Sequence, residues 1–121
     1  MIQLINWFEL PVLDFNRARL FYEHVFQMKM PVGPMGEYLM GFFPSPSGPM
    51  GAIVQGEGYV PSVYGPRLFL NANPNLDEFL VRALEAGAQL IVPKTFISED
   101  VGYCAYILDP EGNAIALNSL T

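Results

Sequence analysis

The segment that most constrains the fold is 102–118, where two apolar runs flank the turn Asp109-Pro-Glu-Gly-Asn113. Proline presets φ early in such a turn, and a Gly-Asn pair tolerates the positive φ of a tight reversal. The flanking runs are rich in Tyr, Ile, Leu and Ala, which is typical of strands. The sequence therefore predicts a β-hairpin that closes a sheet.

The rest of the chain indicates one order of elements, used twice. Apolar spacing and turn residues predict, in chain order, a strand at 4–12, a helix at about 16–27 capped by Asp14, strands at 37–43 and 51–55, a strand at 67–72, a helix that starts near Asp77, runs through 79–84 and ends at Gly87, and strands near 88–92, 102–108 and 114–118. Segment 57–66 has too many Gly and Pro residues for either element. We expect two βαβββ modules, at 4–57 and 66–119, in one domain spanning 1–121.

The charge balance excludes several classes of partner. The sequence has six basic and twelve acidic residues, which gives a net charge of −6, and the basic residues are dispersed along the chain. Nucleic acid and anionic membrane surfaces are therefore not expected partners. Cys104 is the single cysteine, so an intramolecular disulfide is ruled out. With no basic start followed by a long apolar run, and no membrane-length apolar stretch, the sequence predicts a cytoplasmic protein.

Several blocks, in order, resemble the vicinal oxygen chelate superfamily, which includes glyoxalases, bleomycin-resistance proteins and extradiol dioxygenases. The blocks are 8–14, 17–18, 21–23, 25–26, 51–61, 93–95, 102–103 and 109–113, and they cover essentially the whole chain. They are most similar to small bacterial glyoxalase-like proteins. The resemblance implies an α+β fold in which two βαβββ modules form a curved mixed sheet around a cup.

The resemblance also implies where a metal would bind. In metal-dependent members, His, Gln or Glu side chains from the first and last strand of each module hold one divalent ion, which binds two substrate oxygens as a Lewis acid. The matching positions here are Trp7, Val54, Arg67 and Ala116. None of these side chains is a suitable ligand. An overlay shifted by one residue substitutes Gln55 for Val54, but one amide does not hold an ion. We expect no metal and no other cofactor.

Strand alternation selects the residues that face the expected cup. These candidate ligand-binding residues are Trp7, Glu9, Arg67, Asn71, Tyr106 and Asn118. Glu9 is the clearest polar anomaly, because a carboxylate on an apolar strand needs a partner. It is the candidate catalytic residue, as a general base, or an anchor for a basic ligand group; the alternative is a salt bridge with Arg67. Arg67 suits a carboxylate or phosphate, or lies at the rim as a surface residue.

Two other reactive side chains are expected to lie outside the cup. His24 falls on the first helix, which would pack on the outer side of the sheet in the implied fold. Cys104 lies within an aromatic strand without a basic neighbour in sequence, which favours a small buried apolar role.

The leading hypothesis is a small-molecule-binding protein of this superfamily that has lost the usual metal-ligand positions. An apolar, aromatic cup with one carboxylate favours a flat aromatic or cationic ligand. One alternative is an enzyme, a dioxygenase or a glyoxalase-like lyase or isomerase resembling lactoylglutathione lyase, with Glu9 as base or metal ligand. Another is a dimeric interaction module. Because superfamily members commonly pair, we expect a homodimer.

Overall fold

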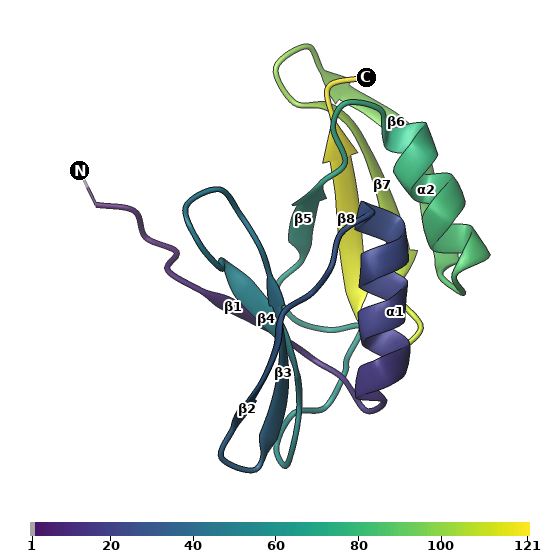
Figure 1. Ribbon diagram of the computed structural model, residues 1–121. Coiled ribbons are helices and arrows are strands. Elements are labelled where there is room, and N and C mark those ends of the chain that lie inside the picture. The colour runs from purple at the N-terminus through teal and green to yellow at the C-terminus, as the bar shows by residue number, and fades with distance from the viewer. Residues whose placement is uncertain (1) are drawn as a thin grey trace.

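The computed structural model describes residues 2–121, so Met1, the first residue of the predicted domain, lies outside the described chain. The first half contains β1 (Phe8–Pro11), α1 (Phe15–Phe26), β2 (Val32–Met35), β3 (Tyr38–Phe43) and β4 (Gly51–Gln55). The second half contains β5 (Leu68–Asn71), α2 (Leu76–Glu85), β6 (Gln89–Ser98), β7 (Gly102–Leu108) and β8 (Ala114–Ser119). Figure 1 shows the two groups of strands at an angle to each other.

Each half forms a four-stranded mixed sheet. The strand orders are β1-β4-β3-β2 and β5-β8-β7-β6, and in each sheet only the first pair, β1 with β4 or β5 with β8, is parallel. The predicted α+β class is therefore confirmed. We expected one curved mixed sheet, but the strands of the described chain form two separate hydrogen-bonded sheets. Strand β1 is at an edge of the first sheet, and β5 is at an edge of the second.

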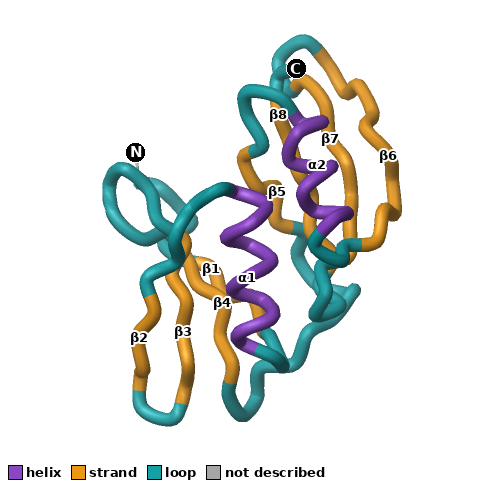
Figure 2. The backbone as a smooth tube through the Cα atoms, turned by 45° about the vertical axis from the view of Figure 1, so that its right-hand side comes forward, coloured by secondary structure: helices purple, strands orange, loops and turns teal. Residues whose placement is uncertain are grey.

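The two helices are capped locally and pack against each other. The Asp14 side chain accepts a hydrogen bond from the Arg17 N–H at 3.1 Å, as expected for the cap of α1. The cap of α2 is Asn75, which accepts from the Asp77 N–H at 2.9 Å, and α2 begins at Leu76, next to the predicted start near Asp77. The rings of Phe26 and Phe79 lie 5.6 Å apart and join the helices, which run side by side in Figure 2.

One apolar core joins both sheets and both helices. Leu10 and Ile53 from the first sheet, Tyr22 from α1, and Ile107 and Leu117 from the second sheet are all buried in this core. Because alternate residues of a strand face opposite sides, the neighbours of these core residues lie on the other faces of the sheets. A smaller buried cluster of Met40, Ala52 and Val54 lies on that other face of the first sheet.

Strand boundaries differ from the predicted ones where tertiary pairing decides them. Strand β2 has the sequence Val-Gly-Pro-Met, which lacks an apolar alternation, and it forms by pairing with β3. Strand β6 continues to Ser98, six residues beyond the predicted end, and its pairing with β7 shifts register three times. Only 8–11 of the predicted first strand is regular.

Candidate functional site

The turn Asp109–Asn113, here called the acidic turn, fixes one end of the boundary between the modules. Asp109 is only 4% exposed, and its carboxylate accepts hydrogen bonds from the N–H groups of Glu111 and Asn113, each at 2.9 Å. It also accepts from the Tyr22 hydroxyl on α1 at 2.6 Å. Burial raises the pKa of Asp109 even though these donors oppose that shift. Burial, together with Asp109, also raises the pKa of Tyr22, so the hydroxyl remains a donor.

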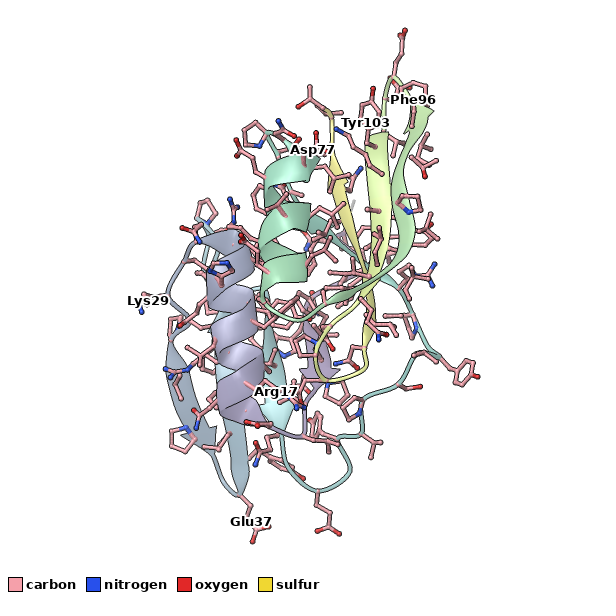
Figure 3. All side chains as sticks on the ribbon, turned by 90° about the vertical axis from the view of Figure 1, so that its right-hand side faces the viewer. Arg17, Lys29, Glu37, Asp77, Phe96 and Tyr103 are labelled. Atoms are coloured by element: carbon pink, nitrogen blue, oxygen red, sulfur yellow. The ribbon has the colours of Figure 1, made fainter. Side chains whose placement is uncertain are left out.

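Glu111 extends from the same turn to the start of α1. One carboxylate oxygen accepts from the N–H groups of Leu13 and Asp14 at 2.7 and 2.9 Å, and the other accepts from Arg17 Nε at 2.6 Å. Burial acts to raise the pKa of Glu111, but the hydrogen bonds from Arg17 and the two backbone groups outweigh it and lower that pKa. A carboxylate at a helix N-terminus also interacts favourably with the helix dipole. Figure 3 shows Arg17 near the start of α1.

Asn113 completes these contacts. Its Nδ2 donates to the Pro11 carbonyl at the end of β1, at 2.8 Å, and its Oδ1 accepts from the Ser62 N–H at 3.3 Å. The acidic turn of the second module therefore orients β1, the start of α1 and the segment between β4 and β5.

A cavity of about 400 Å³ lies beside β1 and β5, and we call it the junction cavity. It is bordered by all four residues of β1, by Leu68 of β5, by the segment from Val60 to Pro66, and by Asn113 and Ala114. Its volume is within the range of small-molecule sites. Glu9 is the only charged residue at its border.

The Glu9 carboxylate is held by two aromatic donors. The Tyr59 hydroxyl donates to one oxygen at 2.6 Å, and Trp7 Nε1 donates to the other at 3.2 Å. The hydrogen bond to Glu9 raises the pKa of Tyr59 above its ordinary value, so the phenol stays protonated near neutral pH. Each carboxylate oxygen keeps capacity for another donor, because a carboxylate offers about four lone-pair sites.

A glycine allows Tyr59 to reach this position. The Tyr59 N–H donates to the Gly56 carbonyl at 3.1 Å, and the Tyr38 ring lies so close to Gly56 that a Cβ there would be 2.0 Å from a ring atom. Tyr38 and Tyr59 then meet edge to face, with ring centroids 5.4 Å apart. Sequence reasoning missed Tyr59, because it lies in the breaker-rich segment 57–66. The flanking Gly56 and Gly58 are the only local signal of a tight turn there.

The second module offers a separate aromatic surface. The Arg67 guanidinium lies 4.1 Å from the centre of the Tyr106 ring, and Phe69 meets Tyr106 edge to face at 6.1 Å. Within residues 2–121, Glu9 and Arg67 form no ion pair, so the predicted alternative of a salt bridge between them is wrong. The structure brings Trp7 together with Glu9, and Arg67 together with Tyr106.

The two candidate asparagines lie at other places and make local contacts. Asn118 Nδ2 donates to the carbonyls of Val101 and Tyr103, at 2.9 and 2.8 Å. Asn71 Oδ1 accepts from the backbone and side-chain nitrogens of Asn73, both at 2.8 Å. Any role of these amides in binding stays a prediction.

The residues present do not fit the metal site that the resemblance implies. Val54 and Ala116 are buried alkyl side chains, and across residues 2–121 no group of three His, Cys, Asp or Glu side chains is arranged to hold a metal ion. Glu9 is held by a phenol and an indole, neither of which replaces a missing ligand.

The remaining reactive side chains lie apart from Glu9. His24 is on α1, where its Nε2 lies 3.4 Å from a Glu85 carboxylate oxygen, and both side chains are largely exposed. Cys104 is buried on β7.

Among residues 2–121, neither helix is long and apolar enough to span a lipid bilayer.

Comparisons with known proteins place this geometry in a fold group. No protein-family model and no curated protein matches the sequence. A glyoxalase/bleomycin resistance protein from Albidiferax ferrireducens T118 is 20% identical, with a TM-score of 0.71 over 97% of this chain and 98% of that one. A glyoxylase/bleomycin resistance protein/dioxygenase domain from Frankia sp. EAN1pec is 16% identical, with a TM-score of 0.73 over 98% and 93%.

A third solved structure carries ligands. A mutant of the fosfomycin resistance protein FosX from Listeria monocytogenes, complexed with Mn(II) and 1S,2S-dihydroxypropylphosphonic acid, is 20% identical, with a TM-score of 0.71 over 100% of this chain and 93% of that one. These matches cover nearly full lengths at low identity. The chain therefore has the fold of the glyoxalase, bleomycin-resistance and dioxygenase proteins, as its sequence predicts.

Proposed function

We propose that the chain binds a small organic molecule in the junction cavity and that Glu9 is the anchor for a cationic group on that molecule. The observation that carries the proposal is that Glu9, whose carboxylate is held by Tyr59 and Trp7, lines a cavity of about 400 Å³. Two fixed donors orient the carboxylate before a ligand arrives, which reduces the entropy lost on binding.

The surroundings favour a cation that also has a flat apolar part. The rings of Trp7 and Tyr59 lie next to the carboxylate, and aromatic faces attract cations. The net charge of −6 favours the approach of cations to the whole molecule. We propose that the bound state needs no metal, and that Arg67 and Tyr106 contact only ligands large enough to reach the second sheet.

A fluorescence titration tests this proposal. Trp7 is the only tryptophan, so its emission reports on the carboxylate directly. The probe is phenyltrimethylammonium, and benzyl alcohol is the uncharged aromatic control. We expect saturable quenching by the cation, and binding by the alcohol that is weaker by about tenfold or more, which corresponds to about 1.4 kcal/mol.

Two variants with the same change in net charge separate a local effect from a general one. Glu9→Gln should weaken binding of the cation by about tenfold. Glu37→Gln should leave it unchanged, because Glu37 lies at the tip of the β2–β3 hairpin, as Figure 3 shows. Equal affinities of the wild type and Glu9→Gln would refute the anchor. Turnover of a hemithioacetal that Glu9→Gln abolishes would replace the binding proposal with a lyase or isomerase.

We also propose that the chain forms a homodimer. Support comes from large apolar side chains that the described chain leaves in water, including Leu90, Ile91, Phe96 and Ile97 on β6, each more than 40% exposed. Figure 3 shows Phe96 on the outermost strand of its sheet. Burial of these side chains against a second copy would be favourable. Light scattering tests this, and a monomer mass at every concentration would contradict it.

A further inference from the structure

A second cavity, of about 370 Å³, borders Phe8 at the start of β1 and Leu70 and Asn71 at the end of β5, and we call it the apolar cavity. It lies between the C-terminal end of α1 and the turn Pro44–Pro49, here called the serine-proline turn. Phe8, Phe26, Phe43, Met28, Met50 and Leu70 supply most of its wall. None of its ten lining residues carries a charge, so it differs in chemistry from the junction cavity beside Glu9.

The aromatic part of the wall is firmly placed. The Phe8 ring lies against Gly51, where an added Cβ would be 2.5 Å from the ring, and it packs 5.3 Å from the ring of Phe43. Phe26 is held by its contact with Phe79. The two methionines are flexible by nature and adjust to the outline of an occupant. Rigid aromatic faces with adaptable thioethers are suited to an apolar guest.

Two polar groups at the wall, the Ser45 hydroxyl and the Asn71 side-chain oxygen, already have partners. The Ser45 hydroxyl donates to the Gly48 carbonyl, and Asn71 Oδ1 accepts two hydrogen bonds from Asn73. A charged ligand would lose its hydration here without a compensating partner, which is unfavourable. The wall therefore selects against ions.

The size of the cavity sets the size of the ligand. A dry cavity of about 150 Å³ lined by apolar side chains holds one benzene molecule. We propose that the apolar cavity is a second binding site of this protein, and that it takes an uncharged planar aromatic molecule of about two fused rings. Glu9 is not part of this site, and Phe8 is the one residue that borders both this cavity and the junction cavity.

Methionine methyl groups provide a local test with the full chain. The probe is 2-naphthol, which is uncharged at neutral pH, added to protein labelled with carbon-13 at the methionine methyls. We expect saturable shifts of Met28 and Met50, which line the cavity, because a bound ring shifts nearby methyl resonances. Met40 serves as the internal control, because it is buried on the other face of the first sheet, in the cluster that Tyr59 covers.

A matched pair of variants tests the location. Met50→Trp replaces a flexible thioether at the partly exposed wall with a bulky indole ring. It should lower the affinity for 2-naphthol by about tenfold, as read from the Met28 methyl resonance. Met35→Trp makes the same change on β2, outside the cavity, and should leave the affinity unchanged.

Four results would overturn the proposal. They are shifts of Met40 in place of Met28 and Met50, no saturable shift up to the solubility limit of 2-naphthol, equal affinities of the wild type and Met50→Trp, and shifts of Met28 and Met50 that follow protein concentration without probe. The last result would mean that a second copy of the chain covers the cavity.

Discussion

The acidic turn and the serine-proline turn occupy corresponding places in the two modules, each joining the last two strands. Each has a backbone hydrogen bond of 3.0 Å. In the acidic turn the Gly112 N–H donates to the Asp109 carbonyl, and in the serine-proline turn the Gly48 N–H donates to the Ser45 carbonyl. Both glycines have positive φ, 97° and 110°. The environments of the two turns differ. Three side chains of the acidic turn are at most 8% exposed, whereas the other turn is mostly in water.

The difference shows how one backbone geometry gives two outcomes. Carboxylates in the acidic turn accept hydrogen bonds from the N–H groups of Leu13 and Asp14, just before α1, and from the Tyr22 hydroxyl. The serine-proline turn has no carboxylate, and Pro49 stands where Asn113 would supply a backbone donor. One end of the boundary between the modules is therefore linked by hydrogen bonds of buried side chains, and the other end, at the serine-proline turn, has the uncharged apolar cavity.

The largest effect should come from Asp109→Ala. This change leaves the Tyr22 hydroxyl and the N–H groups of Glu111 and Asn113 without their acceptor in the core. Each unsatisfied buried group costs roughly 1–3 kcal/mol, so we expect a loss of about 3 kcal/mol or more in the free energy of unfolding. Urea denaturation measures it.

The control is the corresponding position in the other turn. Ser45→Ala should cost less than about 1 kcal/mol, because the hydroxyl is partly exposed and bonds only within its turn. Equal losses for the two variants would mean that the turns do not differ in stabilising the fold.

Tyr22→Phe should have the next largest effect. It removes the hydroxyl that links α1 to Asp109 while it keeps the buried ring. We expect a loss of about 1.5–3 kcal/mol, the range for one hydrogen bond to a charged group. Tyr64→Phe, at an 86% exposed tyrosine, should change stability by no more than about 0.5 kcal/mol. A negligible effect of Tyr22→Phe would show that this link contributes nothing.

The pH dependence of stability should separate the two carboxylates. The pKa of Glu111 is lowered in the folded state, so its contribution is present above the unfolded value of about 4.3 and is lost as pH falls through the folded value. The pKa of Asp109 is raised, so its contribution is present below about 3.9 and is lost as pH rises through the folded value.

Conservative amides test these opposite signs. Glu111→Gln should flatten the acid limb of the stability profile, and Asp109→Asn should reduce the loss that occurs as pH rises above about 4. Urea midpoints between about pH 3 and 7 measure both profiles. Profiles parallel to that of the wild type would contradict the assignment.

The smallest effect should come from adding a carboxylate to the serine-proline turn. Ser45→Asp supplies an acceptor for the Ser47 N–H, but Pro49 has no N–H to match that of Asn113. We expect a change within about 0.5 kcal/mol. Stabilisation by more than about 2 kcal/mol would show that a missing carboxylate alone separates the two turns.

Local chemistry made the hairpin at 102–118 predictable, because Pro110, Gly112 and the apolar runs act within a few residues. The role of its turn was not predictable in the same way. Tyr22 and Asp109 are separated by 87 positions, and Arg17 and Glu111 by 94. No local pattern indicates that these side chains meet.

The candidate site shows the same limit. Glu9 was recognisable as a carboxylate on an apolar strand, but its donor Tyr59 lies 50 residues away in a segment without regular structure. The expected partner Arg67 instead lies over Tyr106, since an aromatic face is available on the same sheet. Long-range placement of side chains, which strand alternation does not specify, decided both outcomes.

The acidic turn holds the two modules together, and amide hydrogen exchange tests this most directly. The Leu13 and Asp14 N–H groups belong to the first module and bond to Glu111 of the second, whereas the Val12 N–H bonds to the Val54 carbonyl within the first. Leu13 and Asp14 should be protected in the wild type and lose protection in Glu111→Ala, while Val12 stays protected. Unprotected exchange of Leu13 and Asp14 in the wild type, or protection unchanged by Glu111→Ala, would contradict this role of the turn.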